Sequence, residues 1–196
     1  DRDDLVAFLD KVPANVLVVL DEAYCEYFEA NEFPDGVSLL STYPNLIVTR
    51  TFSKAWGLAA LRVGYAVSSA DIADVLNRVR QPFNVDSVAL AAATAVLDDA
   101  DYLERSREVN RQGLKQLAAG FEALGLTYIP SCGNFIAVEV GDDASAVFEG
   151  LLKRGVIVRP VSGYGMTRHL RISVGLEDQN AQCLDALGAV MESLHG

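Results

Sequence analysis

A lysine set among hydroxyl residues, small residues and glycines is the feature of this sequence that most clearly suggests chemistry. Residues 51–65 read TFSKAWGLAALRVGY, which places Lys54 next to Ser53 and eight residues before Arg62. A lysine amine in such a setting can form a Schiff base with a carbonyl cofactor and can then transfer protons. The hydroxyls of Thr51 and Ser53 and the guanidinium of Arg62 suit a phosphate group. This segment therefore predicts a covalent site for a phosphorylated carbonyl cofactor.

An acidic residue at the end of an apolar run supports the same chemistry. Residues 16–20 read VLVVL and are followed by Asp21, with Tyr24 three residues further on. Ligands of open α/β sheets gather outside the carboxyl ends of the strands. A carboxylate there can keep a pyridine nitrogen protonated, so that the ring acts as an electron sink, and Tyr24 can donate to the ring's phenolic oxygen. Together with Lys54, this pattern indicates pyridoxal 5'-phosphate. Alternatively, Asp21 only caps a turn and Lys54 is a solvated residue at a helix start.

Two arginines near the end of the sequence form a second candidate site. Arg159 ends the apolar run 156–158, and Arg171 lies within the apolar segment 170–175, LRISVG. Burying an arginine in an apolar strand is costly unless it meets an anion. A substrate carboxylate or phosphate would supply that anion with bidentate geometry, and an internal Asp or Glu would also do so. No metal-ligand spacing accompanies the histidines or the cysteines, so we expect no metal.

These residues require strands that alternate with helices. Apolar and β-branched runs predict strands at 16–20, 46–50, 62–67, 134–140, 156–159 and 169–174. The run at 16–20 is typical of a strand buried on both faces of a parallel sheet. Helical spacing predicts helices at 3–11, 71–80, 87–97, 101–124, 144–154 and 178–194. A connecting loop is predicted at 31–44.

This alternation predicts an α/β fold in two parts. We expect residues 1–108 to belong to a large domain with a mixed or parallel sheet, and residues 109–196 to form a small α+β domain. Hydrophobic residues make up 51% of the chain, enough for packed cores, and the formal net charge of −11 makes nucleic acid and anionic membranes poor partners. Three widely spaced cysteines and no long apolar run are typical of a reduced, cytoplasmic protein.

The sequence resembles the histidinol-phosphate aminotransferases, which belong to the fold-type I pyridoxal-phosphate enzymes. The resemblance rests on Asp21-Glu22-Ala23-Tyr24, on segment 51–65, on the stretch 131–135, SCGNF, and on segment 170–175. It implies that Lys54 is the Schiff-base lysine, and that the cofactor is also bound by Asp21, Tyr24, Thr51, Ser53 and Arg62. It further implies that Arg171 and Arg159 bind the substrate anion.

The resemblance also implies partners and leaves alternatives open. It implies an amino-acid or amino-alcohol phosphate substrate, a 2-oxo acid and a homodimer. Family chains are longer on the amino-terminal side, so we expect this chain to be the carboxyl-terminal portion and to be inactive alone. The alternatives are an aromatic amino-acid aminotransferase, a threonine-phosphate-type decarboxylase and a cofactor-sensing effector domain of a transcriptional regulator.

Overall fold

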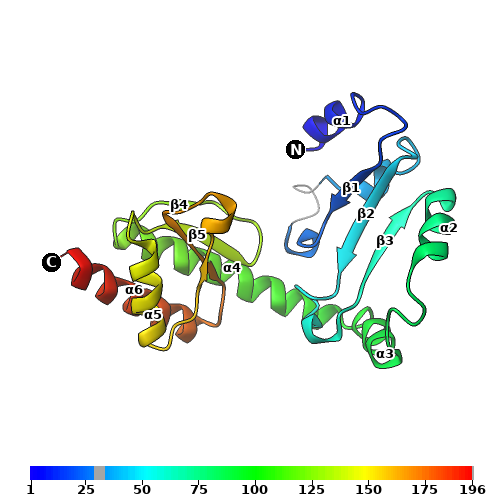
Figure 1. Cartoon of the computed structure of the whole chain (residues 1–196). Coiled ribbons are helices and arrows are strands. Elements are labelled where there is room, and N and C mark those ends of the chain that lie inside the picture. The colour runs from blue at the N-terminus through cyan, green and yellow to red at the C-terminus, as the bar shows by residue number, and fades with distance from the viewer. Residues whose placement is uncertain (29–33, 196) are drawn as a thin grey trace. The chain divides into compact units, whose positions relative to one another are not determined.

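The computed structural model describes residues 1–28 and 34–195, and it divides into two compact units, Asp1–Ser106 and Arg107–Gly196. Figure 1 shows both units, each of which combines a sheet with helices. The sheet of the first unit is mixed and that of the second is antiparallel. The predicted combination of a mixed-sheet α/β part with a smaller α+β part is therefore confirmed.

The first unit is built on a three-stranded sheet in the order β1-β2-β3 (Figure 1). Strand β1 (Val18–Asp21) runs parallel to β2 (Leu46–Thr51), and β3 (Gly64–Ser68) runs antiparallel to β2. Apolar and β-branched side chains favour the extended backbone in all three strands. Leu46 and Val48 of β2 are fully buried, so the central strand anchors the sheet.

Two expectations for these strands are corrected. The prediction that the first strand is buried on both faces is wrong within this chain, because Leu17 is 60% and Val19 is 61% exposed. β1 pairs with β2 alone, and its side chains alternate between partly buried and exposed. The strand predicted from residue 62 begins only at Gly64, because Arg62 has a left-handed backbone conformation with φ of 54°.

Helices and short 3-10 turns complete the first unit. The helices are α1 (Arg2–Leu9), α2 (Ala70–Val79) and α3 (Ser87–Val96), and the 3-10 turns are η1 (Cys25–Tyr27), η2 (Gly36–Leu39) and η3 (Ala59–Leu61). Part of the loop predicted at 31–44 lies outside the described residues, and the described part contains η2. One apolar cluster joins α1 to β2, and another joins α3 to the residues around Phe52. The second cluster includes Phe52 and Val63 of the lysine segment itself.

The second unit is an antiparallel sheet packed on helices. Its strands are β4 (Tyr128–Ile129), β5 (Phe135–Glu139), β6 (Arg159–Pro160) and β7 (His169–Ser173), in the order β4-β5-β7-β6. The chain enters it through α4 (Ala100–Ala123), and α5 (Ala144–Lys153) and α6 (Glu177–His195) follow. Gly125 stands just after α4 with φ of 69°, the left-handed conformation that ends many helices. A single core joins α4, α5 and α6 to β5 and β7.

The sequence was least informative about the short strands of this unit. The strand predicted at 156–159 is wrong over most of its length, because the strand begins at Arg159 and covers only two residues. Ile157 is 82% exposed and therefore makes no core contact that would hold a strand there. Strand β4 was not predicted at all, since two residues are too few for a periodic signal.

Within the described part of the chain, none of the helices combines the length and the apolar character that crossing a bilayer requires.

Candidate active site

The parallel pairing of β1 and β2 brings the predicted cofactor residues to one edge of the first sheet. Asp21 is the last residue of β1 and Thr51 is the last residue of β2, and Asp21 lies opposite Thr49 in the register. Because parallel strands end at the same edge, the loops that carry Tyr24 and Lys54 leave the sheet side by side. This is where ligands bind in open α/β sheets.

The structure brings Lys54 and Tyr24 together across these loops. The Nζ atom of Lys54 lies 5.3 Å from the centre of the Tyr24 ring, which is within the range of a cation–π contact. The Lys54 side chain makes no hydrogen bond or ion pair with the described residues, and it is half-buried. An amine held over an aromatic ring without an acidic partner remains available to react with a ligand.

Asp21 is exposed at the sheet edge. One of its carboxylate oxygens, Oδ1, accepts a hydrogen bond of 3.1 Å from the backbone N–H of Ala23. This bond holds the carboxylate against the start of the loop that carries Tyr24. The turn-capping interpretation of Asp21 is therefore correct as a description of its local contact, and it is compatible with a second contact to a ligand.

The proposed phosphate-binding residues are only partly brought together. Thr51 Oγ1 accepts a hydrogen bond of 3.1 Å from the backbone N–H of Ser53, so these two hydroxyl residues lie in one tight turn. Arg62 is exposed, and its Nη1 donates to the carbonyl oxygen of Ala59 at 2.7 Å. That bond folds the guanidinium back over its own turn. The structure thus places Thr51 and Ser53 together and gives Arg62 a local partner.

A buried ion pair beneath this edge was missed by the sequence analysis. Glu22 is 2% exposed, and its Oε2 accepts hydrogen bonds from Nε and Nη2 of Arg50 at 2.9 and 2.7 Å. Arg50 Nη2 also donates to Asp35 Oδ1 at 2.7 Å. Partial burial lowers the pKa of Arg50, but hydrogen bonds to Glu22 and Tyr65, together with the charges of Cys25 and Glu22, outweigh it and raise the pKa above its ordinary value. The only sequence signal is that Glu22 directly follows one apolar strand and Arg50 lies near the end of another.

The neighbouring loop carries a further polar contact and a thiol. Trp56 Nε1 donates to Glu26 Oε1 at 3.1 Å, which joins the lysine segment to η1. Cys25 directly precedes Glu26. Burial, and to a smaller extent the negative charge of Glu26, raises the pKa of the Cys25 thiol to about 12. Such a thiol stays protonated at neutral pH and is a poor nucleophile.

Arg159 and Arg171 lie opposite each other in the second unit. They are direct partners in the antiparallel register of β6 and β7, so their side chains share one face of the sheet. The neighbours of Arg171 in β7, Leu170 and Ile172, are buried in the core, so the arginines lie on the face away from the helices. Arg159 starts its strand, which corrects the prediction that it ends one.

Arg171 has an unsatisfied polar atom. Its Nε is buried and has no hydrogen-bond partner, and its guanidinium carbon lies 4.7 Å from the centre of the Phe135 ring. Neither arginine forms an ion pair with an Asp or Glu among the described residues. The described residues therefore do not supply the internal carboxylate that was the alternative to a ligand anion.

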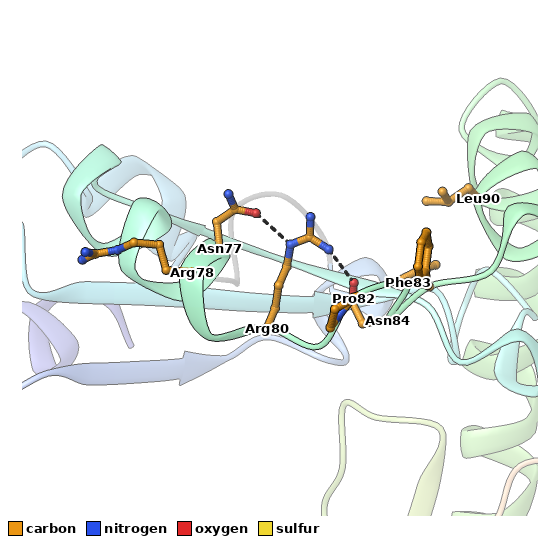
Figure 2. A pocket seen from close by; sticks show the side chains of 8 residues that line it. Asn77, Arg78, Arg80, Pro82, Phe83, Asn84 and Leu90 are labelled. Carbon is orange, nitrogen blue, oxygen red and sulfur yellow. Dashed lines mark hydrogen bonds between the residues drawn. The ribbon is translucent and has the colours of Figure 1, made fainter.

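A separate hollow of about 710 Å³ lies beyond α2 and contains none of the predicted site residues (Figure 2). Figure 2 shows Arg80 between two asparagines, with Nε donating to Asn77 Oδ1 at 2.7 Å and Nη1 to Asn84 Oδ1 at 3.0 Å. Phe83 lines it and is 97% exposed.

Histidine, cysteine and acidic side chains do not gather into a metal-binding cluster in residues 1–28 and 34–195.

The chain belongs to the aminotransferase class I and II family, whose model matches residues 1–187. It is 63% identical over 189 residues to histidinol-phosphate aminotransferase 2 of Pseudomonas aeruginosa, covering 96% of this chain and 51% of that protein. It is 56% identical over 190 residues to histidinol-phosphate aminotransferase 1 of Nitrosococcus oceani, covering 97% and 51% of the two chains. The chain thus spans about half the length of the curated relatives it matches.

A solved structure confirms the expected fold type. The crystal structure of histidinol-phosphate aminotransferase from Sinorhizobium meliloti in complex with pyridoxal-5'-phosphate superposes with a TM-score of 0.91 at 34% identity. The match covers 98% of this chain and 53% of the other. The predicted resemblance is therefore confirmed at the level of family and fold.

Proposed function

We propose that this chain is the lysine-bearing half of a pyridoxal-phosphate-dependent aminotransferase that exchanges an amino group between histidinol phosphate and 2-oxoglutarate. The observation that carries the proposal is the contact of Lys54 with Tyr24 at the edge where β1 and β2 end. The identity of 63% to a histidinol-phosphate aminotransferase supports this choice of substrate.

The residues at this edge fit the cofactor. Lys54 offers an amine with no acidic partner among the described residues, Asp21 offers an exposed carboxylate, and Ser53 and Thr51 offer hydroxyls in one turn. Pyridoxal phosphate requires an amine for its aldehyde, an anion for its ring nitrogen and donors for its phosphate, and it supplies a ring that withdraws electrons from the substrate α-carbon.

Each residue would then have a distinct task. Lys54 Nζ would bind the cofactor covalently and, once released, move a proton to or from the substrate α-carbon. Asp21 would hold a proton at the cofactor's ring nitrogen, and Tyr24 would donate to its phenolic oxygen. Thr51, Ser53 and Arg62 would hold the phosphate group. For Arg62, this requires at least one guanidinium N–H besides the one that binds Ala59.

Arg171 and Arg159 would bind the anionic group of the amino donor or the oxo acid. The buried, unpaired Nε of Arg171 supports this role, because a ligand carboxylate or phosphate would satisfy it. Their shared face on the second sheet gives one anion access to both guanidinium groups. The residues 1–108 and 109–196 would be the large-domain and small-domain parts of the enzyme. We also infer a cytoplasmic homodimer, and the three free cysteines support a reducing compartment.

The test is an amino-donor profile of the intact protein that carries this chain. Histidinol phosphate, phenylalanine and phosphothreonine are supplied in parallel with 2-oxoglutarate, and glutamate formation and carbon dioxide release are both measured. The proposal expects glutamate formation with histidinol phosphate and no carbon dioxide. Preference for phenylalanine would contradict the substrate, and carbon dioxide release from phosphothreonine would replace the aminotransferase with a decarboxylase.

A further inference from the structure

We propose that two polar links, Glu22–Arg50 and Glu26–Trp56, are positioning contacts that set where the Lys54 amine lies relative to Asp21 and Tyr24. The proposal rests on the proposed function, because it assigns these four residues a task at the same cofactor site. None of the four is itself assigned a contact with the cofactor or the substrate.

Along the sequence, the residues of the two links flank the residues that they would position. Glu22 and Glu26 stand on either side of Tyr24, and Glu22 directly follows Asp21. Arg50 and Trp56 stand on either side of Lys54, four residues before it and two residues after it. The loop after β1 is therefore tied to the segment after β2 at two points, with Tyr24 and Lys54 held between them.

The Glu22–Arg50 link is rigid because both carboxylate oxygens are used. Oε2 accepts both guanidinium bonds, and Oε1 accepts a bond of 2.7 Å from the backbone N–H of Gly36. Gly36 is buried, and a Cβ at that position would lie 2.7 Å from Glu22 Oε1. The carboxylate is thus held by three hydrogen bonds from two residues, which leave it little rotational freedom.

The Glu26–Trp56 link adds a second constraint on the opposite side of Lys54. The indole N–H reaches Glu26 Oε1 at 3.1 Å, and the Trp56 ring packs against Phe52, whose ring centre is 6.1 Å away. Phe52 is 6% exposed and belongs to the apolar cluster that joins the lysine segment to α3. Trp56 therefore connects Glu26 to the apolar core, because its N–H binds Glu26 and its ring contacts Phe52.

Stability alone is a weak explanation for the first link. Burying an ion pair costs desolvation energy that its attraction repays only in part, and apolar residues of similar volume often serve stability as well. A site whose chemistry depends on the distance between two loops does need such directional contacts, because side chains in catalytic sites are held by their supporting shell. The two links join the loop that carries Tyr24 to the segment that carries Lys54, whose separation the chemistry depends on.

The experiment uses the intact protein and two readouts that do not depend on turnover. The first is the Kd for pyridoxal phosphate added to the cofactor-free protein. The second is the induced circular dichroism of the bound cofactor at its absorption maximum, which reports how rigidly an achiral chromophore is held. Glu22→Gln, Arg50→Lys and Trp56→Phe are compared with wild type, and far-UV circular dichroism and Tm record folding.

We expect each variant to raise the Kd about tenfold and to reduce the induced signal per bound cofactor by about half. The matched control is Asp35→Asn, which alters the exposed second partner of Arg50 and keeps an oxygen for it. Its Kd and induced signal should stay within about twofold of wild type. Glu22→Gln combined with Arg50→Lys should be no worse than the more damaging single variant, because partners in one contact are not additive.

The outcomes separate this inference from the proposed function. Wild-type protein that fails to bind the cofactor overturns both. If wild type binds the cofactor normally and the variants have a lower Tm but an unchanged Kd and induced signal, the proposed function is retained. The links are then structural contacts only. If Glu22→Gln does not fold, Trp56→Phe decides, since it keeps a six-membered aromatic ring at this position and removes the indole N–H that donates to Glu26. An unchanged induced signal in that variant contradicts the proposal.

Discussion

At the scale of single residues, the proposed role of Arg171 in substrate binding depends on a buried donor that has no partner. Its Nε is buried without a partner, and its guanidinium lies over Phe135 rather than beside a carboxylate. An unsatisfied buried donor is costly, so an anion that binds there gains the hydrogen bond and removes the cost. Arg168 in the same unit differs, because it is already paired with Glu139 and Asp142.

This contrast makes a prediction for substrate affinity. Arg171→Met in the intact protein should raise KM for the amino donor roughly ten- to hundredfold, because a hydrogen bond to a charged group contributes about 1.5–3 kcal/mol. Steady-state kinetics with the donor varied give KM, and a cofactor titration gives the Kd, which should not change. Arg168→Met is the control and should leave KM near the wild-type value. Equal effects of the two variants would contradict the role of Arg171.

At the scale of elements, the lysine segment depends on a tight turn that only glycine fits well. Gly57 has φ of 72°, and a Cβ there would lie 2.2 Å from the hydroxyl oxygen of Tyr102. Two separate costs therefore oppose any larger residue: the left-handed backbone conformation and the overlap with the tyrosine hydroxyl. The turn begins directly after Lys54, whose carbonyl oxygen accepts the Gly57 N–H at 2.9 Å.

The two costs can be separated by mutation. Gly57→Ala should lower the free energy of unfolding by about 1–3 kcal/mol, measured by urea denaturation of the intact protein. Adding Tyr102→Phe should restore part of that loss, because it removes the overlapping oxygen and leaves the backbone strain and a tight contact of 3.1 Å with the ring carbon Cζ. Tyr102→Phe alone is the control. If the double variant is as unstable as the sum of the single variants, the overlap plays no part.

The elements also show how far sequence reasoning reaches. The runs that became β2, β5 and β7, and the periodic segments that became α1 to α6, were located within a few residues, because burial on one side imposes a period. Strands β4 and β6 are too short to carry a period. The exposure of Val19 was missed because an apolar run does not reveal which of its faces is covered.

In the candidate site, the residue types could be predicted from the sequence, whereas the contacts between distant residues could not. Lys54, Asp21 and Tyr24 could be proposed because their residue types suggest chemistry, and the pairing of β1 with β2 brings them to one edge. The link between Glu22 and Arg50 joins residues that are 28 positions apart, and nothing in a single sequence pairs them. The local bond that folds Arg62 onto Ala59 was equally invisible.

At the scale of the whole molecule, the two units have separate cores. The core of the second unit is formed by α4, α5, α6, β5 and β7, whereas the first unit has two smaller clusters around β2 and α3. Leu187 in α6 and Leu46 in β2 are both fully buried, each in the core of its own unit. The stability of one unit should therefore respond weakly to a cavity in the other.

Hydrogen exchange can test this independence. Leu187→Ala should cost about 2–5 kcal/mol in its own unit, and it should speed amide exchange in β5 and β7 without changing β2. Leu46→Ala should have the reverse effect. Mass spectrometry of peptides from the intact protein measures both patterns. A uniform acceleration across both units in either variant would show that they unfold together.

The most direct test of the central claim is to identify the lysine that carries the cofactor. The chain contains four lysines, Lys11, Lys54, Lys115 and Lys153. The intact protein is loaded with pyridoxal phosphate, the linkage is fixed with sodium borohydride, and peptides are mapped by mass spectrometry. The account predicts one modified residue, Lys54, and loss of the modification in Lys54→Ala. Modification of another lysine, or persistence of the label in that variant, would contradict it.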